Sequence, residues 1–520
     1  MPRSSTAKAP KGRYKTAQGN ALGNAAPEAQ NPERAGHLPD SWRLLPLGKI
    51  GYWFGGGTPS KANPSFWTNG TIPWVSPKDM KTDRIRDAQD HITTEAVANS
   101  ATSLVPAGSV LLVVRSGILK HTLPVAVTER EVSLNQDLKA VTPSEDILPE
   151  YLALGLKAFE REILHRCCKS GTTVQNLEMP VFLRFELPVA RLPDQRRIVA
   201  EIEKQFTRLE AGVAALRRVQ ANLKRYRAAV LKAACEGRLV PTEAELARAE
   251  GRSFESGQQL LARILTERRQ NWLVQRSLGK GGQGRGKYKE PEMPDTKPLA
   301  KPPEGWAWAT PEQLSSSESY SLGIGPFGSN LKVSDYTTEG VPLIFVRNIR
   351  PGRFVKAKEV YVTAAKAEEL KAHQASGGDI LITKMGAPPG DACLYPEDAP
   401  NAVITADCIK LRPSPLLSDR RFFVHALNSE LVKPQILDIT KGVAQMKVSL
   451  GRFECIAIPL PPLAEQTRIV AEVERRLSVV EELEAVVTTN LQRATRLRQS
   501  ILQMSFQTGV ASGGGERSDA

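Results

Sequence analysis

Two long stretches of the chain repeat apolar residues at alternating steps of three and four positions. The first runs from Ile202 to Val230 and the second from Val473 to Ile501. This spacing puts one apolar stripe along a helix and is typical of helices that pair in a coiled coil. The apolar positions of the stripes are Ile202, Phe206, Leu209, Val213, Leu216, Leu223, Val230, Val473, Leu477, Val480, Val487, Leu491, Ala494 and Ile501. The polar positions, which fix register at a cost in stability, are Gln220, Arg227, Glu484 and Arg498.

Each stretch predicts a helix of about 37 residues, which is about 55 Å long at 1.5 Å per residue. If the two helices pair with each other, they must run antiparallel, because a second domain begins where the first helix ends and the second helix returns. An alternative is two ordinary amphipathic helices that each lie on their own domain. The length of the stripes, about nine steps, favours pairing over this alternative.

The chain contains an internal repeat. Residues 194–210 and 465–481 align without a gap, 271 positions apart, and shorter matches upstream keep the same order. Each half therefore has a tryptophan opener, a strand-rich domain, a proline hinge and a long helix. Buried strands are predicted at Leu47, Val110–Val114, Ile380–Ile382 and Val403–Ile404. The predicted fold class is α+β, with two homologous mixed α/β domains at the ends of two antiparallel helices and a pseudo-twofold axis between the halves.

A helical stretch and a linker lie between the halves. Residues 253–275 have an apolar face, and residues 277–306 are rich in Gly, Lys and Pro, which is typical of a flexible and then extended linker. The apolar face consists of Leu260, Leu261, Ile264, Leu265 and Trp272. The predicted segments are a disordered basic tail (1–35), a first domain (36–190), a hinge and helix (191–240), the helical insert and linker (241–300), a second domain (301–460), a second hinge and helix (461–507) and a disordered tail (508–520).

Composition favours a polyanionic partner. The 520 residues include 70 Lys and Arg against 56 Asp and Glu, a net charge of +14. Such a surface attracts nucleic acid, although a basic but inert surface is an alternative. No apolar run reaches the ~20 residues of a membrane span, and the basic N-terminus lacks the apolar core of a secretory signal, so we expect a cytoplasmic protein. The six cysteines form no C-x-x-C pair, which indicates reduced thiols without metal or disulfides.

Several short motifs suggest enzymes but fail in context. Residues 54–57 and 63–66 resemble the cofactor loop and the adenine-gripping tetrapeptide of methyltransferases, yet whole βαβ units would have to separate the two. Residues 281–287 match a P-loop, but Tyr288 stands where Ser or Thr is needed. Residues 378–384 lack the second carboxylate of a magnesium-dependent nuclease. We therefore expect no catalytic, cofactor or metal site in this chain.

The chain resembles the specificity (S) subunit of type I restriction–modification systems over about residues 36–510. The resemblance is carried by residues 55–80, by the two hinge segments PDQRRIVAEIE and AEQTRIVAEVE, and by residues 231–241, 260–272 and 286–308. It implies that each half has one target recognition domain and one spacer helix, and that the helices form an antiparallel coiled coil. It also implies that the two domains read a split sequence in double-stranded DNA.

The resemblance further implies partners. Two adenine-N6 methyltransferase (M) subunits would dock along the helices, and motor-nuclease (R) subunits would join them. S-adenosylmethionine, ATP and Mg²⁺ would belong to these partners. A stand-alone divergent DNA methyltransferase, a non-specific basic coiled-coil scaffold and an inactive S subunit remain alternatives.

Candidate DNA contacts are polar and basic residues that follow predicted strands or flank glycines, because Arg, Lys, Asn and Gln read base edges while Lys, Ser and Thr hold phosphates. In the first domain they are Thr58, Ser60, Lys61, Lys78, Arg115, Lys120, Gln175 and Asn176. In the second domain they are Ser329, Asn330, Lys332, Arg347, Asn348, Arg350, Lys384, Gln445 and Lys447. For any single residue a solvated surface charge is the alternative, and recurrence in both halves supports the set.

Overall fold

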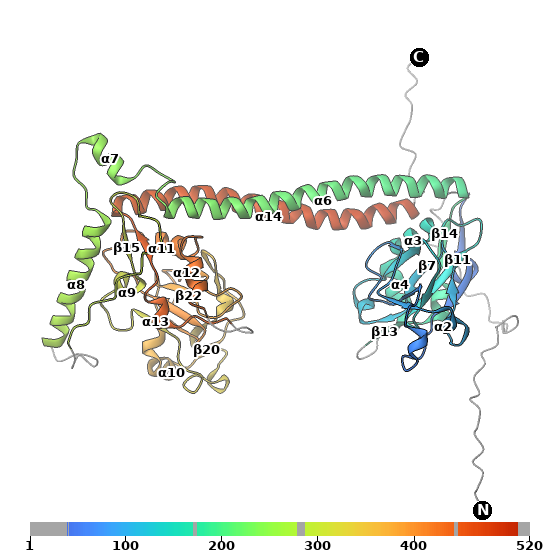
Figure 1. The fold of residues 1–520 in the computed structure, drawn as a ribbon, viewed down its shortest axis with the longest axis horizontal. Helices are drawn as coiled ribbons and strands as arrows, with labels where there is room; N and C mark the ends of the chain where they lie inside the picture. The colour runs from blue at the N-terminus through green and yellow to red at the C-terminus, as the bar shows by residue number, and fades with distance from the viewer. Residues whose placement is uncertain (1–38, 40, 170–173, 278–286, 441–445, 508–520) are drawn as a thin grey trace, which may run out of the picture. The chain divides into compact units, whose positions relative to one another are not determined.

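The computed structural model describes residues 39, 41–169, 174–277, 287–440 and 446–507. The predicted tails and Gln445 lie outside the described residues. The chain divides into two compact units, residues 1–213 with 492–520 and residues 214–491. Each unit contains one strand-rich domain and part of each long helix (Figure 1).

The domain of the first unit has two main sheets and two small ones. One main sheet has the order β2-β11-β7-β9-β4 and the other β5-β3-β10-β6. Their strands are β2 (Gly51–Gly55), β3 (Ile72–Val75), β4 (Arg84–Ile85), β5 (Asp90–Ile92), β6 (Leu104–Val105), β7 (Val110–Val113), β9 (Val125–Thr128), β10 (Val132–Leu134) and β11 (Leu138–Pro143). The small sheets join β1 (Arg43–Pro46) to β14 (Glu186–Val189), and β12 (Cys168–Lys169) to β13 (Gln175–Leu177) and β8 (Arg115–Ser116).

The domain of the second unit repeats most of this topology, with four strands where the first domain has five and with a separate pair of β18 (Ile349–Arg350) and β19 (Arg353–Phe354). Its main sheets have the orders β16-β25-β22-β23 and β20-β17-β24-β21, and β15 pairs with β26 as β1 pairs with β14. The strands are β15 (Ala307–Ala309), β16 (Leu322–Ile324), β17 (Val341–Ile344), β20 (Tyr361–Val362), β21 (Gln374–Ala375), β22 (Ile380–Thr383), β23 (Ala392–Leu394), β24 (Ala402–Ile404), β25 (Cys408–Leu411) and β26 (Ile458–Leu460). The prediction of two similar α+β domains is confirmed.

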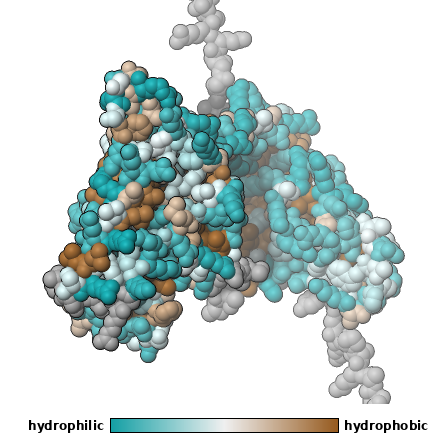
Figure 2. Space-filling view, turned by 60° about the vertical axis from the view of Figure 1, so that its left-hand side comes forward, coloured by the Kyte–Doolittle hydropathy of each residue, from teal (hydrophilic) through white to brown (hydrophobic). Residues whose placement is uncertain are grey.

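The central strands form because their residues are apolar and rich in β-branched side chains. All residues of β7 and of β22 are buried, as continuous apolar runs predict for strands covered on both faces. Helix α3 (Pro149–Ala158) packs on β7 and β9 in the first domain, and α11 (Arg420–Leu427) on β23 and β26 in the second. The surface in Figure 2 is largely hydrophilic, with smaller hydrophobic patches.

One predicted strand residue is wrong. Leu47 is fully buried, but it lies in the 3-10 turn Leu47–Lys49 and not in a strand. Pro46 ends β1, and the N–H of Leu47 donates to the carbonyl of Phe185 instead of to a neighbouring ladder position.

The two long helices are α6 (Leu192–Cys235) and α14 (Leu463–Gln507), which are longer than predicted. In the second unit, the cluster that contains Val230 also contains Val473, and Leu223 packs with Val480 and Val487, so the helices run antiparallel there. In the first unit, Phe206 packs with Leu502. Every apolar seam residue that was predicted is buried or half-buried, whereas the polar position Gln220 is exposed. Their pairing as one coiled coil over the whole length stays a prediction.

The two arginines at polar seam positions, Arg227 and Arg498, pair with acidic residues of the opposite helix. Nη2 of Arg227 is 3.3 Å from Oε2 of Glu484 and 3.7 Å from Oε1 of Glu481, within the second unit. Nη1 of Arg498 is 3.0 Å from Oε1 of Glu210, within the first unit. These ion pairs fit one register of the helices and support the assignment of these positions as register-setting.

A repeated glutamine anchors the start of each long helix. Gln195 is fully buried, and its Nε2 donates to the carbonyls of Asp146 and Ala190, each at 2.8 Å, while its Oε1 accepts from the N–H of Leu148. Gln466 is also fully buried and donates to the carbonyl of Pro461 at 2.9 Å. The hinge glutamines recur because each fixes its helix to the domain that precedes it.

The insert between the halves consists of α7 (Glu243–Glu250) and α8 (Gly257–Ser277). Leu260, Leu261 and Ile264 are buried in the core of the second domain, as predicted. Trp272 is only half-buried, and its ring lies 5.5 Å from that of Tyr288. The described part of the predicted linker thus packs back on α8.

Candidate nucleic-acid interface

In the first domain, the predicted loop after β2 packs directly on the segment Leu134–Asp137. The N–H of Gly57 donates to the carbonyl of Leu134 at 2.8 Å, and a Cβ on Gly56 would lie 1.6 Å from the carbonyl oxygen of Asn135. Only glycine permits this approach of two backbones. The contact leaves Thr58, Ser60 and Lys61 exposed.

The end of β7 continues into a small sheet beside the same segment. The N–H groups of Val114 and Arg115 both donate to the carbonyl of Asp137. Arg115 lies opposite Asn176 in the β8–β13 ladder, and its Nε is 3.2 Å from Oδ1 of Asp137. Arg115 and Asn176 are exposed, whereas Gln175 is half-buried. Lys120 is exposed at the end of the 3-10 turn Gly117–Lys120 that follows β8.

Lys78 projects from a turn at the end of β3. The carboxylate of Asp79 accepts from the N–H and hydroxyl of Ser76 and so fixes the turn. Lys78 is exposed and pairs with Asp90 at 2.8 Å, and this hydrogen bond raises the pKa of its ammonium. Strand β3 runs parallel to β10, and the Leu134–Asp137 segment follows β10. The turn after β3 therefore lies beside this segment.

The second domain repeats this frame in its backbone hydrogen bonds. The bond from Asn135 N–H to Val75 recurs from Thr405 to Ile344, each at 2.9 Å. The bond from Val114 N–H to Asp137 recurs from Lys384 to Asp407, each at 2.8 Å. The bond from Leu177 N–H to Val114 recurs from Val448 to Lys384, at 2.8 and 3.0 Å. The close glycine Gly56 recurs as Gly325, which leaves no room for a Cβ against Thr405.

These equivalences place the predicted residues of the second domain. Ser329, Asn330 and Lys332 are exposed on the loop after Gly325. Lys447 is exposed and forms a bridge with Met385, while Lys384 is half-buried and donates to the carbonyl of Ala406 at 3.3 Å.

Two arginines follow β17. Arg347 occupies the turn position of Lys78 and lies 3.9 Å from the centre of the Phe345 ring. Arg350 is exposed, and its Nη1 donates to the carbonyl of Ile349 at 2.9 Å.

The structure places the side chain of Asn348, a predicted DNA contact, inside the domain. Its side chain is 6% exposed, with Oδ1 accepting from the N–H of Phe345 and Nδ2 donating to the carbonyl of Val355, both at 2.9 Å. Asn348 thus fixes its turn as Asp79 fixes the equivalent turn in the first domain. Because both ends of its amide are used inside the domain, we leave it out of the interface.

Two exposed residues of the first interface were not predicted from the sequence. Gln136 is exposed, and its Oε1 accepts from the hydroxyl of Thr58. Lys169 is exposed and lies opposite Asn176 in the β12–β13 ladder. One feature of the sequence could have pointed to Gln136: it precedes Asp137, which recurs as Asp407 in the internal repeat. No pattern in the sequence marked Lys169, because its position depends on a ladder two residues long.

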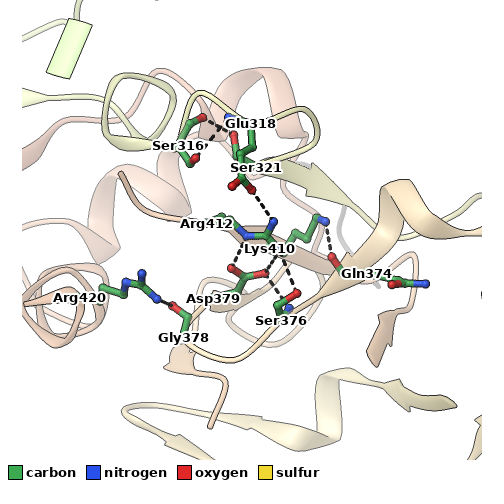
Figure 3. A network of polar contacts seen from close by, with 10 residues as sticks. All are labelled: Ser316, Glu318, Ser321, Gln374, Ser376, Gly378, Asp379, Lys410, Arg412 and Arg420. Atoms are coloured by element: carbon green, nitrogen blue, oxygen red, sulfur yellow. Dashed lines mark hydrogen bonds and ion pairs between the residues drawn. The ribbon is translucent and has the colours of Figure 1, made fainter. Parts of the chain in front are cut away.

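A buried polar network lies at the end of β22 and β25 that is opposite to Lys384 and Asp407 (Figure 3). Asp379 is 1% exposed and accepts from Nε and Nη2 of Arg412 at 2.9 and 3.1 Å. Burial lowers the pKa of the neighbouring Lys410 ammonium to about 8. The network ties β22 to β25, and Lys384 and Asp407 lie at the ends of these strands. We assign it a structural role, because all of its carboxylates and cations are satisfied within the domain.

Other site classes find no support in the described part of the chain. Within it, no three His, Cys, Asp or Glu residues come together as metal ligands. No helix among the described residues is long and apolar enough to cross a membrane. The six cysteines are free thiols.

The two domains thus share one backbone frame, and each presents exposed hydrogen-bond donors on it. A family model described as "Type I restriction modification DNA specificity domain" matches residues 39–215 and 347–485. The chain therefore belongs to the family of type I restriction–modification specificity subunits, which are the non-catalytic subunits of these systems.

Individual relatives agree with this assignment. The chain is 44% identical over 163 residues to the Type I restriction enzyme EcoR124I/EcoR124II specificity subunit of Escherichia coli, a match that covers 31% of this chain and 40% of that protein. It is 27% identical over 166 residues to the MjaIX specificity subunit of Methanocaldococcus jannaschii, covering 31% and 37%. The chain thus spans about two fifths of the length of these relatives.

A solved structure shares the fold. It comes from work titled "Structural basis underlying complex assembly and conformational transition of the type I R-M system". The match covers 91% of this chain and 99% of that one, with a TM-score of 0.58 and 18% identity.

Proposed function

We propose that the chain directs a type I restriction–modification complex to a bipartite DNA target. Each strand-rich domain reads one half of the target, and the paired helices set the gap between the halves. Two adenine-N6 methyltransferase subunits dock along the helices, and motor-nuclease subunits join through them. S-adenosylmethionine, ATP and Mg²⁺ are bound by those partners.

One observation carries the proposal: the same backbone frame recurs in both domains and presents exposed basic or amide side chains at matched places. Lys78 and Arg347 share one such place, and Asn176 and Lys447 share another. If the repeat had only a structural role, the two domains would need to share the backbone hydrogen bonds but not the exposed hydrogen-bond donors at matched places. Donors of this kind are what phosphates and base edges accept from.

The outer surfaces of the helices support docking of a protein partner. In the second unit, five apolar side chains of the two helices are each at least 42% exposed, although they lie outside the seam. They are Val219 and Tyr226 on α6 and Val479, Leu483 and Val486 on α14. Exposed apolar side chains on neighbouring turns are typical of a protein–protein interface.

Sequencing of modified bases in host DNA tests the function. We expect N6-methyladenine in a two-part motif with a fixed gap, and loss of that methylation when the gene is deleted. Methylation that persists after deletion would contradict the proposal. Incubation of the purified chain alone with DNA and labelled S-adenosylmethionine should give no transfer, whereas a stand-alone methyltransferase would label the DNA.

Competition binding separates specific reading from a basic scaffold. Binding through phosphates alone weakens steeply as salt rises and is the same for all sequences. We expect duplexes that contain the motif to compete better than scrambled duplexes at moderate salt. Equal competition at every salt concentration would favour the scaffold.

A further inference from the structure

Three strands of the first domain align one row of polar side chains. In the β12–β13–β8 sheet, Lys169 is opposite Asn176, and Asn176 is opposite Arg115. Residues directly opposite each other in neighbouring strands project from the same face of a sheet. All three are exposed, whereas Leu177, the next residue on β13, is buried. The sheet therefore has a polar outer face and an apolar inner face.

The row has the size of a DNA groove. Neighbouring strands lie about 4.8 Å apart, so three strands span about 10 Å, and the major groove is about 12 Å wide and admits β-ribbons. In Figure 1, β13 lies at the edge of the first domain away from α3, so the helix does not cover it.

Arg115 forms an ion pair with Asp137. Its Nε is 3.2 Å from Oδ1 of Asp137, and Asp137 is itself held by Asn135, whose Nδ2 donates to Oδ2 and whose Oδ1 accepts from the Asp137 N–H. Among the described residues, the two Nη groups of Arg115 have no hydrogen-bond partner. An ion pair at Nε leaves both Nη groups of the guanidinium fork available to an acceptor.

The second domain carries different chemistry at the same place. The matched backbone bonds make Met385 the equivalent of Arg115 and Lys447 the equivalent of Asn176, and these two also lie opposite each other. A thioether replaces the guanidinium fork on an unchanged frame. Lys447 is exposed and Met385 is half-buried, so the two domains present side chains of different hydrogen-bonding type on the same frame.

We propose that Arg115, Asn176 and Lys169 form the base-reading element of the first domain, docked in the major groove. Arg115 donates both Nη groups to O6 and N7 of a guanine, and Asn176 pairs with N6 and N7 of a neighbouring adenine. Lys169, at the edge of the sheet, neutralises a flanking phosphate. The inference rests on the proposed function and adds the half-site chemistry and the residues that read it.

Selection from random DNA tests the inference. The full chain, with its methyltransferase partner where that is needed for purification, selects from duplexes with a randomised core, and the bound fraction is sequenced. We expect Arg115→Lys, which keeps the charge but loses the fork, to weaken the preference for guanine at one position by about 5- to 150-fold. Asn176→Ala should act on a neighbouring adenine, and the other half-site should be unchanged in both variants.

Matched controls separate readout from folding. Arg86 pairs with Glu129 on another exposed edge of the first domain, so Arg86→Lys should change neither the motif nor the affinity. Lys447→Ala should alter only the other half-site. Unchanged thermal melting shows that the variants are folded. If Arg115→Lys does not fold, Asn176→Ala still tests the inference by its own change in base preference.

Three results would overturn the inference, and they differ in whether they also overturn the proposed function. A wild-type chain that selects no motif overturns the proposed function and this inference together. A wild-type motif that survives Arg115→Lys and Asn176→Ala unchanged overturns the reading element alone. A preference lost at an A·T pair in Arg115→Lys, or at a G·C pair in Asn176→Ala, overturns the assignment of bases to residues.

Discussion

At the residue scale, the clearest structural roles belong to buried polar side chains that the internal repeat preserves. Gln195 is the best example, because its amide makes three hydrogen bonds without any exposure to water. Asn348 and Asp79 are a second example, in which an amide and a carboxylate fix the same turn in the two domains. Repetition in such cases records a backbone requirement and not a contact with DNA.

Replacing Gln195 with Ala should destabilise the first unit. The change leaves two carbonyls and one N–H without partners in a buried site, and each unsatisfied group costs about 1 kcal/mol or more. We expect a loss of about 2–4 kcal/mol in the free energy of unfolding, measured by chemical denaturation. Gln205→Ala on the same helix, where the amide only donates to Glu201 near the surface, is the control and should change little. A Gln195→Ala loss below that of the control would show that the anchor is dispensable.

Replacing Glu465 with Gln should remove a pH-dependent weakness of the second unit. Glu465 is fully buried, its Oε2 accepts from the N–H of Glu243, and burial raises its pKa to about 7. The folded protein therefore holds a proton that the unfolded chain releases near pH 4.5, so stability falls as pH rises from about 4.5 to 7. We expect the variant to match the wild type at pH 5 and to gain about 1–3 kcal/mol at pH 8.

Thermal melting at both pH values measures this effect. The charges facing Glu465 are Glu243, which is paired with Arg252 and Arg468, and Arg468 itself. The variant keeps these ion pairs, so they contribute equally to both proteins and do not produce the difference in stability between pH 5 and pH 8. An equal gain at pH 5 and pH 8 would mean that the carboxyl does not titrate in this range.

At the element scale, the seam of the long helices was largely predictable from the sequence. The three-and-four spacing and the internal repeat together located apolar positions that are buried or half-buried in the structure. The reason is that an apolar stripe along a helix must be covered wherever it occurs. Strands β7 and β22 were predictable because each is a continuous apolar run that must be buried. Short elements were not: Leu47 was assigned to a strand but lies in a turn, and the ladder that carries Lys169 is only two residues long.

The interface was predictable in part. The exposure of residues that follow strands, such as Lys78 and Arg115, was predictable because strand ends are where side chains leave the core. The burial of Asn348 was not predictable, because sequence alone does not tell an amide that fixes a turn from one that faces solvent. Gln136 and Lys169 were missed, because their places depend on contacts between segments far apart in the chain.

Charge reversal at the seam should test the register. In Arg227→Glu the new carboxylate faces Glu481 and Glu484, whereas Arg227→Glu with Glu484→Arg restores one opposite pair. Both partners are partly exposed, so we expect a single-variant loss of about 1 kcal/mol and a coupling of about 0.5–1 kcal/mol in a double-mutant cycle. The cycle uses unfolding free energies at low salt. A coupling near zero would indicate another register.

At the scale of the whole molecule, the proposal requires both domains to bind one duplex. Lys61 and Lys332 are suited to a test, because each is exposed on the loop that follows the close glycine of its domain. Each lysine that neutralises a phosphate contributes about 0.9 to the slope of log affinity against log salt concentration. Removal of one should lower the slope by that amount and weaken binding to all sequences equally.

We therefore expect Lys61→Ala and Lys332→Ala each to reduce the slope by about 0.9, and the double variant to reduce it by about 1.8. Fluorescence anisotropy of a labelled duplex between 50 and 300 mM KCl measures the slope, with the exposed Lys301→Ala as a control. The additive result matters most, because a duplex held by one domain at a time would respond to either single change but not to their sum. If one variant is silent, only one domain holds the duplex, and a chain that binds DNA in this way cannot read a target in two halves.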